Sequence, residues 1–132
     1  MEFVVALAAA ALIMGVLDYV WLGFIAKKLY YSEMGGILLK RPNMLAALLF
    51  YIVYVVGVVA LVVYPALLGD SFVEAVSRGA LLGFVAYATY DLTNWATLKG
   101  FSSKIVGIDL LWGTAITALV CAGSFAITDW LV

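Results

Sequence analysis

The sequence predicts an all-α fold, a four-helix transmembrane bundle formed by a single integral membrane domain over residues 1–132. Two observations carry this prediction. Hydrophobic residues make up 67% of the chain and charged residues only 11%, whereas soluble domains are about 45–50% apolar and about 25% charged. The few charges also divide the chain into four apolar stretches, each close to the roughly 20 residues that a helix needs to cross a bilayer.

The four expected spans are separated by charged or turn-forming residues. The first contains Asp18, the third Asp91, and the fourth Asp109 near its start. The second lies in an uncharged run before Pro65, a residue expected to stop or kink the helix because it lacks an N–H donor. The expected spans are approximately 3–26, 43–64, 79–98 and 105–127.

The connection between the first two spans is expected to form a short interfacial segment. Residues 28–39 are too apolar for a free loop, and Gly35-Gly36 indicates a turn within them. Tyr30 and Tyr31 are the kind of side chain that anchors a segment at the level of the lipid head groups.

The distribution of positive charge predicts the orientation of the bundle. Cytoplasmic connections of membrane proteins carry an excess of Lys and Arg, and Arg78 is the exception here. Both termini are therefore expected on the non-cytoplasmic side. The positive side chains of the first and third connections are Lys27, Lys28, Lys40, Arg41, Lys99 and Lys104.

Composition also excludes several functions. The net charge is −1, so no basic surface exists to neutralise phosphates, and no nucleic-acid partner is expected. The chain has no histidine, and Cys121 is its one cysteine. We therefore predict no metal, no cofactor and no catalytic residue, and an enzyme is the less favoured class.

Three aspartates inside the spans need an explanation, because a charged side chain at mid-membrane costs about 2.5–3.5 kcal/mol on insertion scales. Asp18, Asp91 and Asp109 lie about 8–13 Å along their helices from the nearest lysine, at about 1.5 Å per residue. All three are expected at a similar depth in the cytoplasmic half. Helical periodicity places each on a face with small or hydrogen-bonding residues, which favours a common position inside the bundle.

Aromatic and amide side chains accompany these carboxylates. Asp18 and Asp109 are each followed three residues later by a tryptophan, whose indole N–H is able to donate to a carboxylate. Two interpretations stay open: a structural polar network, or a site for a hard cation, a proton or an organic cation. The candidate residues are Asp18, Asp91, Asp109, Asn94, Trp21, Trp95, Trp112, Tyr87, Tyr51 and Tyr54.

Four segments carry a resemblance to a known family: residues 17–23, 50–57, 87–98 and 109–114. They resemble an uncharacterised bacterial family of small four-span integral membrane proteins, catalogued as a domain of unknown function. The most specific part is the motif Tyr90-Asp91-Leu92-Thr93-Asn94. The resemblance implies a multi-pass protein of the bacterial inner (cytoplasmic) membrane and brings no established activity.

Three classes of function are compatible with these observations. The first is a non-enzymatic membrane module or accessory subunit with an acidic polar cluster. The alternative is a small oligomeric transporter, or an ion or proton pathway, that uses Asp18, Asp91 and Asp109. The third is a lipid-binding or lipid-modifying enzyme. The expected partners are membrane lipids, with a homo-oligomer or a larger membrane complex as open alternatives.

Overall fold

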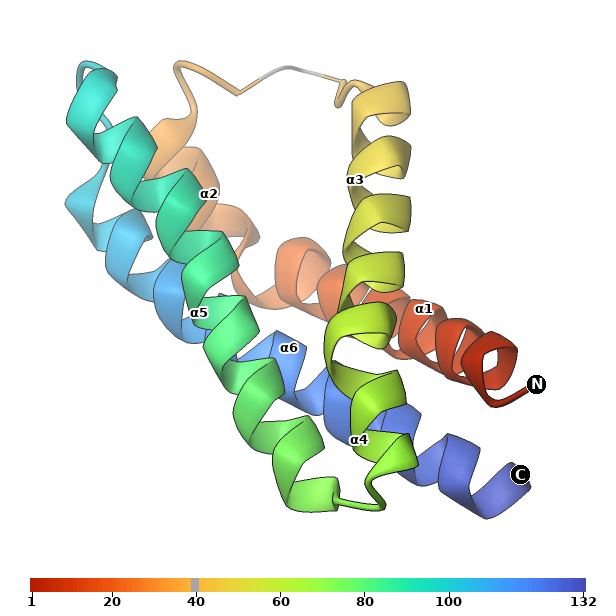
Figure 1. Cartoon of the computed structure of the whole chain (residues 1–132). Helices are drawn as coiled ribbons and strands as arrows, with labels where there is room; N and C mark the ends of the chain where they lie inside the picture. The colour runs from red at the N-terminus through yellow and green to blue at the C-terminus, as the bar shows by residue number, and fades with distance from the viewer. Residues whose placement is uncertain (39–40) are drawn as a thin grey trace.

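A computed structural model describes residues 1–38 and 41–132, and these residues form helices, turns and no strand (Figure 1). The all-α prediction is therefore confirmed for the described part of the chain. The elements are α1 (Glu2–Val20), the π-helical turn η1 (Trp21–Ile25), α2 (Lys27–Met34), α3 (Met44–Val58), the π-helical turn η2 (Val59–Val63), α4 (Tyr64–Leu68), α5 (Phe72–Thr97) and α6 (Ser103–Leu131).

Three helical stretches are long and apolar enough to cross a membrane: Glu2–Ile25, Met44–Leu68 and Ser103–Leu131. The fourth long helix, α5, has 26 residues, or about 39 Å at about 1.5 Å per residue. Glu74, Arg78 and other polar residues lower its hydropathy, so α5 is not among the three.

Helix α5 begins seven residues earlier than the predicted start at residue 79. Ser71 caps it, because its Oγ accepts the backbone N–H of Glu74 at 3.2 Å, and Arg78 lies 3.7 Å from Glu74 one turn further on. The sequence Ser-x-x-Glu is a capping box, which satisfies N–H groups that the first turn of a helix leaves free. The helix therefore starts before the expected span of residues 79–98, which was drawn by taking charged residues as ends of helices, and the bounds of the span itself stay a prediction.

Pro65 was expected to stop or kink the helix; it does not stop it, because the helix continues through Pro65 to Leu68. The π-helical turn η2 immediately precedes Tyr64. Proline lacks the N–H that would bond to the carbonyl four residues earlier, and its ring clashes with that carbonyl. The wider turn just before Pro65 provides room for this irregularity.

The connection after the first span contains the helix α2 and then a turn at the glycine pair, as expected. The turn is closed by the N–H of Ile37, which donates to the carbonyl of Met34 at 3.0 Å. Leu39 and Lys40 lie outside the described residues, so the expectations that fall on these two residues stay predictions.

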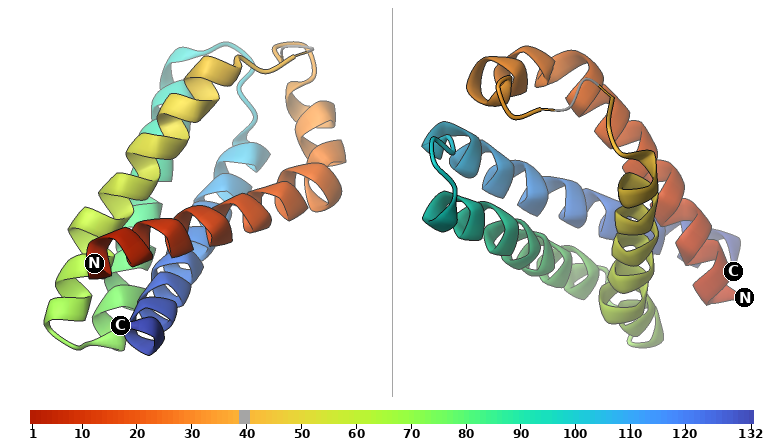
Figure 2. Two further views of the ribbon diagram at one scale, coloured as in Figure 1. Left: turned by 90° about the vertical axis from the view of Figure 1, so that its right-hand side faces the viewer. Right: turned by 90° about the horizontal axis from the view of Figure 1, so that it is seen from above.

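Helices α5 and α6 run side by side in opposite directions (Figures 1 and 2). Their backbones approach closely at Gly79 and Gly83, where an added Cβ would meet Thr117 and Cys121. Small residues at such positions allow membrane helices to pack without large side chains between them. This glycine pair therefore serves as a packing contact between α5 and α6.

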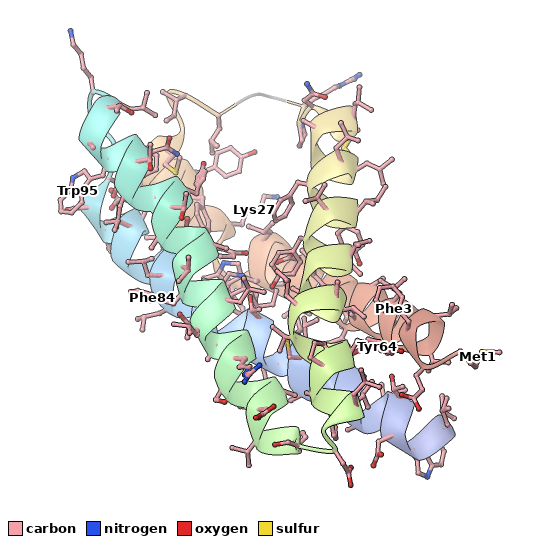
Figure 3. The ribbon with its side chains drawn as sticks, viewed as in Figure 1. Met1, Phe3, Lys27, Tyr64, Phe84 and Trp95 are labelled. Carbon is pink, nitrogen blue, oxygen red and sulfur yellow. The ribbon has the colours of Figure 1, made fainter. Side chains whose placement is uncertain are left out.

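The apolar core lies where α1, η2, α4 and the second half of α6 meet. Phe3 and Tyr64 pack edge to face at its border, with ring centroids 5.5 Å apart (Figure 3), and Ser124 Oγ donates to the carbonyl of Ala6 at 2.8 Å. The buried core residues are Ala6, Ala10, Met14, Val55, Val58, Val59, Val62, Val63, Ala66, Ala75, Ile116, Val120, Cys121 and Phe125.

The first half of α3 has a different environment, because residues 43–50 are exposed on every side. This part of α3 stands apart from α2 and α5 (Figure 1). The two chain termini lie close together, away from the start of α3 (Figure 2). The bundle is therefore packed toward the termini and open toward the start of α3.

Candidate functional site: an acidic-aromatic cavity

A half-open cavity of about 450 Å³ lies in the open part of the bundle. Residues of α1, η1, α2, α3, α5 and α6 contribute to its wall, and the described residues that line it include two carboxylates and neither Lys nor Arg. We call it the acidic-aromatic cavity. It is lined by Asp18, Trp21, Leu22, Tyr30, Phe50, Tyr54, Ala86, Tyr87, Tyr90, Asp109 and Trp112.

Helix α2 closes one side of this cavity. The hydroxyl of Tyr30 donates a hydrogen bond to Oδ1 of Asp109, and Ser102 Oγ donates to Oε2 of Glu33 at 2.8 Å. Burial, and then the hydrogen bond to Asp109, raise the pKa of Tyr30 above its ordinary value. These contacts fix α2 against the start of α6, so Tyr30 forms part of the cavity wall.

Two tryptophans form a flat apolar surface beside Asp18. The rings of Trp21 and Trp112 are stacked, with centroids 4.3 Å apart and planes inclined by 6°. The Trp112 indole of α6 is within hydrogen-bonding reach of Asp18 on α1. Trp112 is therefore paired with the carboxylate of another helix and not with Asp109 of its own helix. The indole N–H of Trp21 is buried near the Tyr30 hydroxyl and makes no hydrogen bond of normal geometry.

Asp91 lies next to the cavity in a closed environment. Its side chain is 0% exposed, and neither carboxyl oxygen has a hydrogen-bond donor among the described residues. Its nearest acidic neighbour is Asp109, at a separation that permits a hydrogen bond if one of the two carboxyl groups carries the proton. Buried carboxyl groups are normally hydrogen-bonded, so this pair is chemically unusual.

Tyrosines from α3 and α5 complete the wall. The hydroxyl groups of Tyr54 and Thr117 are hydrogen-bonded to each other, so this tyrosine is fixed to α6. The ring of Tyr87 lies directly over Gly113, where an added Cβ would overlap the ring. Gly113 therefore sets how closely Tyr87 approaches α6.

Six of the ten candidate residues from the sequence line this cavity: Asp18, Asp109, Trp21, Trp112, Tyr54 and Tyr87. Asp91 lies behind them next to Asp109. In the described part of the chain, no group of three or more His, Cys, Asp or Glu side chains is arranged to hold a metal ion. The structure thus brings carboxylates and aromatic rings to one place without the geometry of a metal centre.

The other three candidates lie elsewhere. Asn94 is half-buried and neighbours Tyr90. Trp95 is 51% exposed and projects away from the bundle (Figure 3). Tyr51 donates to the carbonyl of Ala11 and borders a separate, shallow apolar groove between α1 and α3.

Sequence reasoning missed Tyr30, Phe50 and Tyr90 in the cavity wall. Tyr90 is the first residue of the Tyr-Asp-Leu-Thr-Asn motif and lies three residues after Tyr87, so helical periodicity contained a signal for it. Phe50 likewise lies one turn before Tyr54 on α3. Tyr30 had no such signal, because its position depends on how the chain turns after η1.

Three long apolar helices and the absence of strands in residues 1–38 and 41–132 define the class of this protein, an α-helical membrane protein. The chain belongs to the family described as predicted membrane protein (DUF2177), whose family model matches residues 3–126. Comparisons with curated proteins and with solved structures found no match.

Proposed function

We propose that this protein is a non-enzymatic membrane module that binds an organic cation in the acidic-aromatic cavity. The observation that supports this proposal most strongly is the composition of the cavity wall. Asp18 and Asp109 face a space bordered by Trp21, Trp112 and further aromatic rings, and no basic side chain of the described residues lines it. Such a wall favours a ligand that supplies positive charge and apolar surface together.

The physical basis is that carboxylates and aromatic faces both attract cations. A cation over an aromatic ring gains about 0.5–1 kcal/mol when exposed and about 2 kcal/mol or more when desolvated. The stacked Trp21 and Trp112 rings offer a broad face next to Asp18. A cavity of about 450 Å³ also lies within the range of roughly 300–1,000 Å³ that holds small molecules.

Other ligand classes fit this wall less well. A hard metal ion requires several oxygen ligands, and no group of three or more His, Cys, Asp or Glu side chains in the described residues is arranged to hold one. An anion would be repelled by both carboxylates. A neutral apolar molecule would leave the carboxylates desolvated and without a counter-charge.

We further propose that α5 crosses the membrane as the fourth span, since it packs along α6 over much of its length and is long enough. The end of the bundle that carries Lys27, Lys28, Arg41 and Lys99 would then be cytoplasmic by the positive-inside rule. Both termini would lie on the opposite side. The family resemblance supports the bacterial inner membrane as the location, with membrane lipids covering the exposed apolar faces.

Equilibrium binding of tetraphenylphosphonium, an apolar aromatic cation, to the purified protein in detergent tests the proposed function. We expect saturable binding, and at least tenfold weaker binding for Asp18→Asn and Asp109→Asn, because a buried charge partner contributes about 2–5 kcal/mol or more to binding. Asp129→Asn is the matched control, since Asp129 is exposed near the C-terminus.

Triphenylphosphine oxide, a neutral aromatic molecule of related shape, separates charge recognition from apolar partitioning into detergent. We expect it to bind at least tenfold more weakly than the cation. Equal binding of the two molecules, or binding by Asp18→Asn and Asp109→Asn that matches the wild type, would contradict the proposed function.

A further inference from the structure

We infer that Asp91 and Asp109 share one proton in the free protein, and that an organic cation entering the cavity displaces this proton into water. The inference rests on the proposed function and assigns the cavity a second activity, the exchange of a proton for a cation. Its basis is the contact between a fully buried carboxyl group and one that faces the cavity.

Asp91 is the starting point, because burial and pairing distinguish it from Asp18 and Asp109. It is 0% exposed, whereas the other two are half-buried and line the cavity. Neither of its oxygens receives a hydrogen bond from the described residues, yet it lies within hydrogen-bonding reach of the Asp109 carboxyl group. A contact between two carboxyl groups is attractive only when a proton lies between them.

The described neighbours of this pair include tyrosine hydroxyl groups. Asp109 accepts a hydrogen bond from the hydroxyl group of Tyr30 on α2. Tyr90 of α5 lies near both members of the pair. Tyr87 of α5 lies near Asp109, and it also lies near Asp18 of α1. In residues 1–38 and 41–132, neither Lys nor Arg forms an ion pair with these three aspartates.

Electrostatics then fixes the protonation of the pair. Two carboxylates in one desolvated site cannot both ionise without strong repulsion, so such pairs hold one proton between them. The carboxyl group that holds the proton donates to the other, and Tyr30 donates to Oδ1 of Asp109. The pair thus carries one negative charge in the free protein.

Cation binding changes this balance without changing the net charge of the site. When a cation occupies the cavity, its positive charge stabilises the second carboxylate, the carboxyl O–H bond breaks, and the proton passes to water at the open side of the cavity. One positive charge enters and one leaves. By linkage, the apparent affinity for the cation rises with pH, up to tenfold per pH unit while the pair is protonated in the free protein.

The test measures protons and bound cation in the same sample. Tetraphenylphosphonium is added to the full-length protein in weakly buffered detergent solution that contains a pH indicator dye. We expect close to one proton released per cation bound at pH 7. Asp91→Asn is expected to release a small fraction of that amount and to lose most of the pH dependence of binding, whereas Asp129→Asn is expected to behave like the wild type.

A second measurement addresses the free protein and does not depend on cation binding. Infrared spectroscopy detects the carbonyl stretch of a protonated carboxyl group, and we expect this band in the wild type at pH 7 and its loss in Asp91→Asn. Absence of the band in the wild type overturns the shared proton, whether or not a cation binds.

The two proposals fail in different ways. Binding of the cation without proton release overturns the exchange and leaves the proposed function standing. Failure of the cation to bind overturns the proposed function, and the exchange with it, while the infrared band reports separately on the proton. If Asp91→Asn does not fold, the proton count and the pH dependence of the wild type alone decide.

Discussion

The two halves of the bundle are built in different ways. In the closed half, which holds the buried core, small and β-branched side chains such as Ala10, Val59 and Val120 leave the helices in direct contact. In the open half, which holds the acidic-aromatic cavity, rings and carboxylates line a space between the helices. Residue size and polarity at the helix contacts, rather than overall hydropathy, separate the two halves.

The difference follows from what holds helices together in a bilayer. Lipid tails are as apolar as Leu, so burial of apolar surface gives little drive for association, and close packing and hydrogen bonds take its place. The closed half uses packing at Gly79 and Gly83, together with the hydrogen bond from Ser124 to Ala6. The open half uses hydrogen bonds of tyrosine hydroxyls, from Tyr30 to Asp109 and between Tyr54 and Thr117.

The most severe way to break the closed half is to separate α5 from α6. A Cβ at Gly83 would overlap the carbonyl of Gly113 and the side chain of Thr117. Because one of these neighbours is backbone, Gly83→Leu is expected to cost about 3 kcal/mol or more. Size-exclusion chromatography of the purified protein should then show mostly aggregate.

Gly107→Leu is the matched control, since a Cβ at Gly107 on α6 meets nothing within 4 Å. This variant should elute as the wild type does. A monodisperse Gly83→Leu protein with wild-type stability would mean that α5 and α6 do not pack as closely as described.

A smaller disruption of the same half removes a single buried side chain. Met14 is fully buried in the core, and truncation of such a residue to Ala costs about 2–5 kcal/mol in soluble proteins. The contribution from transfer out of water is absent in a bilayer, so we expect about 2 kcal/mol for Met14→Ala. Unfolding in increasing sodium dodecyl sulfate, followed by circular dichroism, measures it.

Leu12, two residues earlier on α1, is 68% exposed and provides the comparison. Leu12→Ala should change the unfolding midpoint very little. Equal losses for Leu12→Ala and Met14→Ala would show that the face of α1 that enters the core has been assigned incorrectly.

The smallest expected effect concerns the open half, where Tyr30 holds α2 to Asp109. Loss of a hydrogen bond to a charged group costs about 1.5–3 kcal/mol of stability. Because Tyr30 is only half-buried, we expect the lower value, about 1.5 kcal/mol, for Tyr30→Phe. The raised pKa of Tyr30 means that its contribution to stability is complete below about pH 10, the ordinary tyrosine value. That contribution is lost as the pH rises further toward the folded-state pKa.

Thermal unfolding at neutral and at alkaline pH checks both the sign and the size of this effect. The wild type should lose more stability than Tyr30→Phe between the two conditions. Tyr31→Phe should follow the wild type, because Tyr31 is exposed. An identical alkaline loss in Tyr30→Phe and the wild type would contradict the role of the Tyr30 hydroxyl.

The sequence predicted most of the helices and part of the cavity, for reasons that particular residues make clear. The repeated Asp-x-x-Trp spacing placed Trp21 and Trp112 near carboxylates, and their rings stack. Trp95 follows Asp91 at a similar spacing but lies close to the end of α5 at Thr97, where it is exposed. Helical periodicity gives the face of a residue and does not show where the neighbouring helix stops.

Irregular backbone accounts for most of what the sequence did not predict. The π-helical turn η1 redirects the chain before α2, which brings Tyr30 to Asp109, and η2 allows the helix to continue through Pro65. Wide turns of this kind leave no periodic signal in hydropathy. From the sequence, Tyr51 and Tyr54 were grouped in one candidate site. In the structure their hydroxyl groups form hydrogen bonds with different helices, Tyr51 with α1 and Tyr54 with α6.

The central claim, that the open half is a cation site and the closed half is structural, has a direct test in the four tryptophans. Trp21 and Trp112 lie in the cavity, whereas Trp95 and Trp130 are 51% and 84% exposed. The double variant Trp95→Phe/Trp130→Phe keeps only the cavity pair as tryptophan fluorophores, which are excited selectively over the tyrosines. We predict a saturable change of its emission with tetraphenylphosphonium, at the affinity found by equilibrium binding, and no saturable change with triphenylphosphine oxide. Unchanged emission while the cation still binds would place the ligand outside the cavity and contradict the claim.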